Sequence, residues 1–186
     1  MPKSAKITKE MILSAAVSIV REEGAEALGA RAVAARLSSS VQPIFYNFSG
    51  IDELRREVIA EAGRLYAERI ERIIAENKYP AYKCSGMAYV EFATCERELF
   101  KLLFMRDRDA AERADDEALA PVFSLLSESL GVDIETAKLV HLEMWAFVHG
   151  IATMIATGYY EPDAELISSM LTDVYEGLKF RFGGKV

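Results

Sequence analysis

Apolar side chains recur every three or four positions along most of the chain, which is the spacing of a helix with one buried face. The clearest example lies between Thr8, a residue type that caps helices, and Gly24, a residue type that ends them. Its apolar positions are Met11, Ile12, Ala15, Ala16, Ile19 and Val20. No stretch shows sustained alternation of apolar and polar residues, so we expect an all-α fold with about nine helices.

Two short helices are expected next. The first covers residues 30–37, and the second covers residues 41–48, with Ser40 as its N-cap. Pro43 falls in the first turn of the second helix, where a proline breaks no helical hydrogen bond. Two short helices joined by a polar turn are typical of a helix-turn-helix, whose second helix can lie in the DNA major groove. An ordinary three-helix core gives the same pattern, and the pattern alone favours neither interpretation.

Six further helices are predicted in the rest of the chain. Pro80, Pro121, Asp133 and Pro162 mark expected helix starts, and Gly131 marks an expected end. The predicted helices cover residues 51–78, 80–95, 97–105, 134–157 and 162–182, together with a helix in the segment 115–130 that should kink or begin near Pro121. Most residues between 106 and 117 are charged, which predicts a solvated connection, with a charged binding tail as the alternative.

Composition and charge indicate a globular protein. The chain has 186 residues, of which 51% are apolar and 27% are charged, so it can bury a sizeable core in one or two domains. Its net charge of -7 is distributed unevenly: residues 1–60 carry one excess positive charge and residues 61–186 carry the excess of negative charge. This asymmetry suits an N-terminal part that meets a polyanion and a C-terminal part that does not.

The sequence contains no recognised catalytic or metal-binding motif. His141 and His149 are eight residues apart and lack a known metal-ligand spacing, so we expect no metal site, no cofactor and no enzymatic activity. A nucleophilic cysteine–histidine pair assembled from distant helices is the alternative. Cys84 and Cys95 would lie about 16 Å apart along one helix, too far for a disulfide.

The chain also lacks features of secretion or membrane insertion. Residues 1–10 contain three lysines but no apolar run, so we expect no signal peptide and a cytoplasmic location. The longest uncharged stretch, Met144–Tyr160, is interrupted by polar residues and by glycine. We therefore expect a buried helix there and no contact with a membrane.

Several ordered motifs point to a known family. They are Ile12-Leu13-Ser14-Ala15-Ala16, Glu22-Glu23-Gly24, Arg31-Ala32-Val33-Ala34, Ser40 to Phe48 and Asp52-Glu53-Leu54. With these motifs, residues 8–61 resemble the DNA-binding domain of the TetR (tetracycline repressor-like) regulators. Phe92-Ala93 and the stretch Trp145–Gly150 resemble the ligand-binding domain of one branch of that family. The resemblance implies a helix-turn-helix domain over residues 1–50 and a helical effector-binding and dimerisation domain over residues 51–186.

The chain departs from the family pattern at five positions. Members usually carry threonine, glycine, tyrosine, histidine and lysine where this chain has Gly29, Ser38, Phe45, Asn47 and Ile51. Phe45 lacks a hydroxyl and Ile51 lacks a charge, so two phosphate contacts of the family are not transferred. Ser38 in a left-handed cap position would cost stability relative to glycine, whereas Gly29 still suits an N-cap. We interpret the pattern as a variant subset that still binds DNA.

The resemblance and the helical spacing together assign the DNA contacts. Ile44 and Phe48 should pack inward, and the residues that should face base edges are Val41, Gln42, Pro43 and Tyr46. The Gln42 amide can pair with adenine through two hydrogen bonds. The contacts with the DNA backbone are expected from Lys3, Lys6, Lys9, Arg31, Ser40 and Asn47. A solvated tail is an equal alternative for the three lysines.

Aromatic and polarizable residues of the larger domain are candidate effector contacts. They are Tyr66, Tyr89, Phe92, Phe104, Phe123, Met144, Trp145 and His149. For each residue alone, packing in the core is the favoured interpretation, but together they suit an apolar cavity with a few polar tips. No basic cluster accompanies them, so a small apolar effector is a better fit than an anion.

The predicted function is that of a homodimeric repressor that a small apolar effector releases from double-stranded operator DNA. The alternative is a helical ligand-binding or interaction module that has lost DNA binding. We expect the dimer to form through the last two helices, because the final helix carries two apolar stripes. One stripe is Ile167, Leu171, Val174 and Leu178, the other is Leu166, Met170 and Phe180, and Ile151 and Ile155 should join the interface from the preceding helix.

Overall fold

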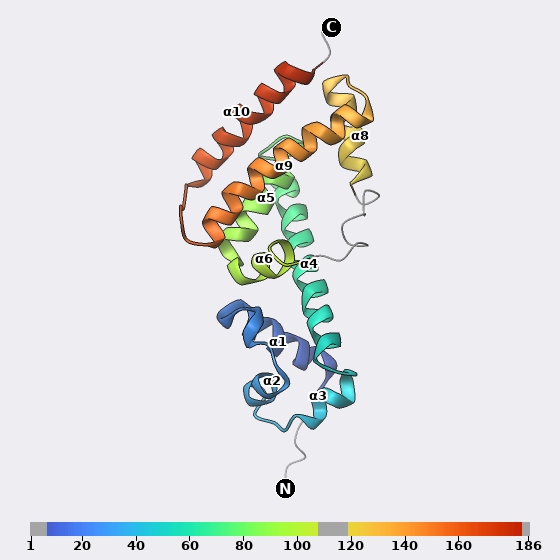
Figure 1. The fold of residues 1–186 in the computed structure, drawn as a ribbon, viewed down its shortest axis with the longest axis vertical. Helices are drawn as coiled ribbons and strands as arrows, with labels where there is room; N and C mark the ends of the chain where they lie inside the picture. Colours follow the sequence, from blue (N-terminus) through green and yellow to red (C-terminus); the bar gives the residue numbers. More distant parts are fainter. Residues whose placement is uncertain (1–6, 108–118, 184–186) are drawn as a thin grey trace. The chain divides into compact units, whose positions relative to one another are not determined.

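The computed structural model describes residues 7–107 and 119–183, which form nine α-helices, one 3-10 turn and no strand (Figure 1). The all-α prediction is confirmed. The elements are α1 (Lys9–Glu23), η1 (Ala25–Ala27), α2 (Ala30–Arg36), α3 (Gln42–Asn47), α4 (Ile51–Ala75), α5 (Ala81–Cys95), α6 (Arg97–Phe104), α8 (Ala120–Leu130), α9 (Ile134–Ala156) and α10 (Ala164–Phe182). Most of the charged segment expected to be a solvated connection, residues 108–117, lies outside the described residues.

Local capping signals explain where most helices begin and end. The Thr8 side chain accepts a hydrogen bond from the Met11 amide, and the Asp133 side chain accepts one from the Thr136 amide, as the sequence predicts. The prediction that Ser40 caps α3 is wrong. Val41 already has helical backbone angles and its carbonyl accepts from the Ile44 amide, so Val41 is the N-cap and Ser40 lies one residue too early. Asp163, rather than Pro162, caps α10.

The chain forms two compact units. The first comprises Met1–Ala67 and Glu96–Arg106, and the second comprises Glu68–Cys95 and Asp107–Val186. The helix α4 contributes residues to both units. The domain boundary expected after residue 50 falls at the start of this helix and stays a prediction.

The first unit is built around α1. Its buried face packs against α2, α3 and α6, and the fully buried side chains include Ile12, Val33, Ile44, Leu54 and Phe100. The Arg21 guanidinium also donates two hydrogen bonds, of 2.6 and 3.0 Å, to the Glu96 carboxylate just before α6. Apolar burial holds α2 and α3 on α1, and the paired contact fixes α1 to the start of α6.

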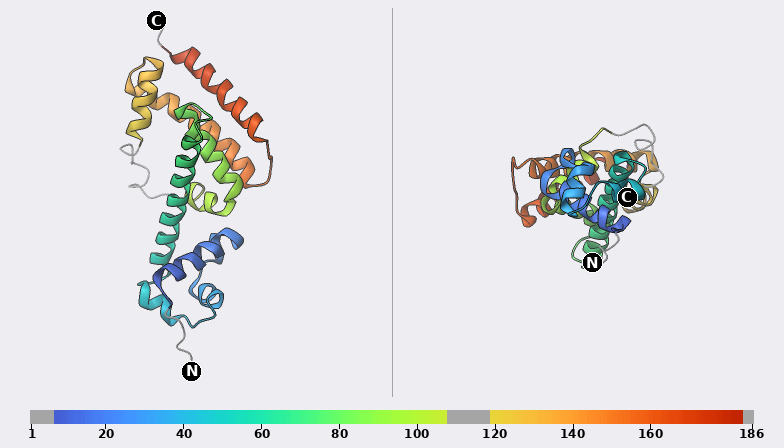
Figure 2. Two further views of the ribbon diagram at one scale, coloured as in Figure 1. Left: turned by 180° about the vertical axis from the view of Figure 1, so that it is seen from behind. Right: turned by 90° about the horizontal axis from the view of Figure 1, so that it is seen from below.

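The second unit has α5 and α9 at its centre. The helices α8 and α10 pack against this pair, which Figure 1 and the reverse view in Figure 2 show from opposite sides. Gly86 on α5 permits close packing, because a Cβ atom there would lie 3.3 Å from Leu171 of α10 and 3.7 Å from Val148 of α9. Among the described residues, α9 alone is long and apolar enough to cross a bilayer, and helices of a soluble core meet the same criterion.

The structure corrects one part of the predicted dimer contacts. Ile151 and Ile155 are both 2% exposed, because their side chains lie in the core of the second unit. They cannot meet a second copy of the chain, so their assignment to a dimer interface is wrong. The first stripe of α10, represented by Ile167 and Leu171, is likewise buried within the chain, whereas Leu166 of the second stripe is exposed.

Candidate functional site

The turn between α2 and α3 is held by the backbone of α2 itself. The Ser38 amide donates to the Ala35 carbonyl at 3.0 Å, and the Ser39 amide donates to the Ala34 carbonyl at 2.9 Å. This pair of hydrogen bonds is a Schellman motif, which requires a left-handed residue at its centre. Ser38 supplies it with φ of 50°, as the sequence predicts. The same motif ends α9, where glycine, Gly158, occupies the left-handed position with φ of 70°.

The short helix α3 has one buried face and one exposed face. Ile44 and Phe48 are buried, as predicted, and they fasten the helix to the core of the first unit. On the opposite face Gln42 is exposed and the Tyr46 side chain is 83% exposed. Val41 and Pro43 are half-buried at the start of the helix. The four residues expected to face base edges therefore lie on or beside the outward surface of α3.

Phe45 also belongs to this outward surface, although it was not among the residues predicted to contact DNA. Its ring is 53% exposed, although large apolar side chains usually avoid water. Phe45 follows Gln42 by three positions, which places both on the same side of a helix. Helical spacing counted from Gln42 would have identified it. We call Val41, Gln42, Phe45 and Tyr46 the α3 surface.

The residues expected to contact the DNA backbone differ in their exposure and in the hydrogen bonds that they already make within the protein. Arg31 and Ser40 are exposed. The Asn47 side-chain amide donates to the Pro43 carbonyl at 2.7 Å, so part of its hydrogen-bonding capacity is used within α3. Lys9 donates to Glu57 at 2.7 Å, and its ammonium lies 5.1 Å from the centre of the Phe48 ring. Lys3 and Lys6 lie outside the described residues.

Lys9 and Glu53 form hydrogen bonds close to the end of α3 and the start of α4. The hydrogen bond with Glu57 raises the pKa of Lys9. At the start of α4, the Glu53 carboxylate accepts a hydrogen bond from the Ser49 amide at 2.6 Å, and this contact lowers the pKa of Glu53. The carboxylate thereby satisfies an amide of the turn between α3 and α4 and stabilises the start of α4.

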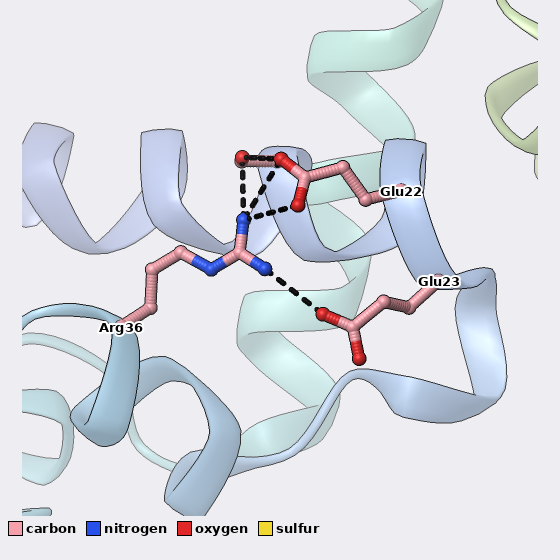
Figure 3. Close-up of polar contacts among 4 residues, drawn as sticks. Glu22, Glu23 and Arg36 are labelled. Atoms are coloured by element: carbon pink, nitrogen blue, oxygen red, sulfur yellow. Dashed lines mark hydrogen bonds and ion pairs between the residues drawn. The ribbon is translucent and has the colours of Figure 1, made fainter.

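An ionic cluster ties α2 to α1. Figure 3 shows the Arg36 guanidinium of α2 pointing toward Glu22 and Glu23 of α1. One of its nitrogens lies 2.9 Å from the Glu22 carboxylate and 2.8 Å from the Ser18 hydroxyl, and the other lies 2.9 Å from Glu23. The Ser18 hydroxyl and the Arg36 cation lower the pKa of Glu22. Arg36 therefore serves the fold of the helix-turn-helix.

Two other arginines were missed by the sequence analysis. Arg55 and Arg56 are exposed on the first turns of α4, soon after the end of α3. Their place at the start of the helix that follows α3 was the available signal. With Arg31, they are exposed cations on α2 and at the start of α4, in addition to Arg36 and Lys9, which pair with carboxylates.

The predicted effector contacts fall into both units. In the first unit, the rings of Tyr66 and Phe104 meet edge to face with centres 5.3 Å apart, and burial raises the pKa of Tyr66. In the second unit, Phe92, Phe123 and Met144 are buried. Each of these placements suits a packed core as well as the wall of a cavity.

Three aromatic residues of the second unit form a continuous array. The Tyr89 hydroxyl lies 2.9 Å from Nδ1 of His149, and the His149 ring stacks on Trp145 with centres 5.0 Å apart and planes 15° apart. Tyr89 is buried, whereas Trp145 is 40% exposed. The array thus runs from the interior of the second unit to the outer face of α9.

A second tyrosine–histidine pair, which the sequence analysis did not identify, joins the same two helices. The Tyr82 hydroxyl lies 3.1 Å from Nδ1 of His141, and the Phe123 ring meets His141 edge to face at 5.6 Å. Burial lowers the pKa of His141 and raises the pKa of Tyr82. Within the described residues, no group of three histidines, cysteines or carboxylates could hold a metal ion, and Cys84 and Cys95 are both free thiols.

One buried hydroxyl near the array has no partner. The Oγ1 atom of Thr153 is buried and forms no hydrogen bond to any described residue. Thr153 follows His149 by one helical turn, so both side chains lie on the same side of α9. A buried hydroxyl without a partner costs free energy unless another group pairs with it.

Comparisons with known proteins agree with this architecture. Residues 84–174 match the family described as tetracyclin repressor-like, C-terminal domain. The chain is 21% identical over 166 residues to the uncharacterized HTH-type transcriptional regulator YobS of Bacillus subtilis, with 88% of this chain and 87% of that protein covered. It is 26% identical over 165 residues to the uncharacterized HTH-type transcriptional regulator Rv0681 of Mycobacterium tuberculosis, with 84% and 73% covered.

Proposed function

The chain is a member of the tetracycline repressor-like (TetR) family, and from that premise we propose that it is a cytoplasmic, homodimeric transcriptional repressor. In this proposal the helix-turn-helix binds double-stranded operator DNA, and a small apolar effector bound in the second unit lowers the affinity for that DNA. The two relatives named above are helix-turn-helix regulators by name, which supports the DNA-binding part. The proposal assigns no catalytic role to the cysteines or histidines.

The observation that carries the proposal is the two-faced helix α3. Its buried residues, Ile44 and Phe48, fix it to the core, and its exposed face leaves Gln42 and Tyr46 available to a partner. A short helix held in this way after a polar turn can enter the major groove with its side chains against the base edges. Arg31, Arg55 and Arg56 can then pair with phosphates, which fix the position of the protein on the duplex.

Effector binding is supported by the interior of the second unit. Tyr89 and Phe92 are buried on α5, and Met144 is buried on α9, so an effector there would meet mainly apolar surface. The buried Thr153 hydroxyl offers a hydrogen bond that no described residue uses. A ligand that pairs with it and contacts the rings would be small, largely apolar and equipped with one polar group.

Dimerisation is supported by apolar side chains on the outer faces of the last two helices. On α9, Leu142 is 57% exposed and Trp145 is 40% exposed, and on α10 Phe180 is 93% exposed. Leu166 adds to the exposed stripe of α10. Large apolar groups that share one face are typical of surfaces that a partner covers, and a two-fold axis would cover this face with itself.

Selection of genomic DNA by the purified protein tests the proposal. We expect recovered fragments to share a pseudo-palindrome, because two-fold-related α3 helices contact two similar half-sites. Binding to that sequence should persist at physiological salt, whereas binding to unrelated DNA should fall steeply as salt rises. If every fragment is retained equally and retention disappears at physiological salt, the chain is a helical binding module without operator specificity.

A further inference from the structure

The turn before α3, α3 itself and the turn after it carry no charge. Residues 37–51 contain no lysine, arginine, histidine, aspartate or glutamate. The preceding cation, Arg36, is engaged by Ser18, Glu22 and Glu23 of α1, and the next cation along the chain, Arg55, lies on α4. The part of the protein proposed to enter the major groove is therefore neutral.

The exposed groups of α3 are one amide, two aromatic rings and one aliphatic side chain. Gln42, Phe45 and Tyr46 are exposed, and Val41 is half-buried at the N-cap. Phe45 places a ring without polar atoms on this surface, and that ring is 53% exposed. Such a ring favours a partner that presents apolar groups at the same place.

The four bases differ in what they present to such a surface. Guanine presents two acceptors, which arginine or lysine pairs best, whereas adenine presents an acceptor beside a donor, which a glutamine amide matches. Thymine alone presents a methyl group in the major groove. A side chain such as Phe45 can cover that methyl group, but it leaves the amine of a cytosine at the same place without a hydrogen bond.

From these observations we infer that α3 selects A·T base pairs in each half-site of the operator. Gln42 pairs with an adenine, and Phe45 and Val41 cover the methyl groups of neighbouring thymines. The Tyr46 hydroxyl can donate to any base acceptor or to a phosphate, so it adds affinity without discriminating among bases. This inference rests on the proposed function and defines the class of sequence that the helix-turn-helix recognises.

Chemically substituted DNA tests the inference without changing the protein. A sequence is first selected from random duplexes by the full-length chain, and its thymines are then replaced one at a time by deoxyuridine, which lacks only the methyl group. We expect affinity to fall about fourfold for each contacted thymine, the change that corresponds to burial of one methyl group. Deoxyuridine in the flanking DNA should have no effect. Replacement of the contacted adenine by 7-deazaadenine should weaken binding by at least about fivefold.

Two variants connect each effect to one side chain. Phe45→Ala should weaken binding to the thymine duplex and abolish the effect of deoxyuridine at the thymine that Phe45 covers, whereas deoxyuridine at the thymine that Val41 covers should still weaken binding. Gln42→Ala should likewise bind the adenine and 7-deazaadenine duplexes equally. Tyr159→Ala is the matched control, because Tyr159 is also a highly exposed aromatic residue but lies after α9 in the second unit. This control should discriminate between thymine and deoxyuridine as the unmodified protein does.

The outcomes separate this inference from the proposed function. Selected half-sites with G·C pairs at the contacted positions, or with full tolerance of deoxyuridine, would overturn the inference and leave operator binding intact. A protein that selects no sequence above random DNA would overturn both. A·T pairs with a loss on deoxyuridine that Phe45→Ala abolishes would support the inference.

Discussion

The Tyr89 hydroxyl of α5 lies 2.9 Å from Nδ1 of His149 on α9. Two turns earlier on α5, Tyr82 makes the equivalent contact with His141, which lies just over two turns before His149 on α9. The two pairs are separated by about 10.5 Å along α5 and about 12 Å along α9, so the two helices run in the same direction with matched spacing. Both histidines of the chain thus fix the register of α5 on α9.

Removal of one tyrosine hydroxyl should weaken this packing. We expect Tyr89→Phe to lower the free energy of unfolding by about 1 kcal/mol, because the hydrogen bond with His149 is lost while the ring remains in the core. Urea unfolding followed by circular dichroism measures the change. Tyr159→Phe removes a hydroxyl from a side chain that is 82% exposed, and it should leave stability unchanged. Equal losses from both variants would contradict a specific role for the Tyr89–His149 contact.

Stability should also depend on pH through His141. Burial holds its pKa below the ordinary value of 6.5, so the folded chain binds fewer protons than the unfolded chain as the pH falls below 6.5. The contribution of neutral His141 to folding stability is complete above that pH. It is lost as the pH falls through the lowered pKa of the folded state. We expect the melting temperature to fall between about pH 7 and pH 5.5, above the range in which carboxylates take up protons. His141→Gln should flatten this part of the profile, and an unchanged slope would exclude His141 as its source.

The fold could be predicted from the sequence where the signals are local. Thr8 and Asp133 cap their helices through hydrogen bonds to amides three residues away, and Ser38 takes the left-handed conformation that its position after α2 requires. Contacts between distant residues could not be predicted in this way. The Tyr82–His141 bond joins residues 59 positions apart, and the burial of Ile151 depends on which neighbours cover α9.

The candidate DNA surface could be predicted in part, because helical spacing is also a local signal. Helical spacing placed Gln42 and Tyr46 opposite Ile44, and the structure has this arrangement. Phe45 was considered only for the hydroxyl that it lacks, although the same spacing places it beside Gln42. The use of Arg36 within the fold depends on Glu22 and Glu23 of another helix, which no local pattern of α2 reveals.

Ser38 is a site where one substitution should increase stability. Its φ of 50° is a conformation that glycine adopts without the steric cost that a Cβ atom brings. We expect Ser38→Gly to raise the free energy of unfolding by about 0.5–1 kcal/mol, with part of the gain offset by the greater freedom of glycine in the unfolded chain. Thermal unfolding measures the change. Ser40→Gly, at a neighbouring position without positive φ, should give no gain, and a gain there would show that the effect is not due to backbone strain at Ser38.

The Arg36 cluster should support DNA binding indirectly. Arg36→Ala removes the contacts with Ser18, Glu22 and Glu23 and leaves the two carboxylates without their common cation, so α2 should be less firmly held on α1. We expect weaker operator binding and a lower melting temperature of the first unit. Arg36→Lys restores the charge but not the forked geometry, and it should recover part of both losses. If Arg36→Ala weakens operator binding without changing the melting temperature, Arg36 contacts the DNA directly.

The outer faces of α9 and α10 should form the dimer interface. Leu142→Glu places a charge on an α9 side chain that is 57% exposed in one chain, so the fold of the single chain should tolerate it. Within an apolar two-fold interface the same residue would bury two like charges, and dimerisation should weaken by at least about tenfold. Leu125→Glu is the matched control on α8, because Leu125 is also partly exposed. Analytical ultracentrifugation should show a dimer for the unmodified chain and for Leu125→Glu but a monomer for Leu142→Glu at micromolar concentration. A dimer that survives Leu142→Glu and dissociates with Leu125→Glu would place the interface on α8 instead.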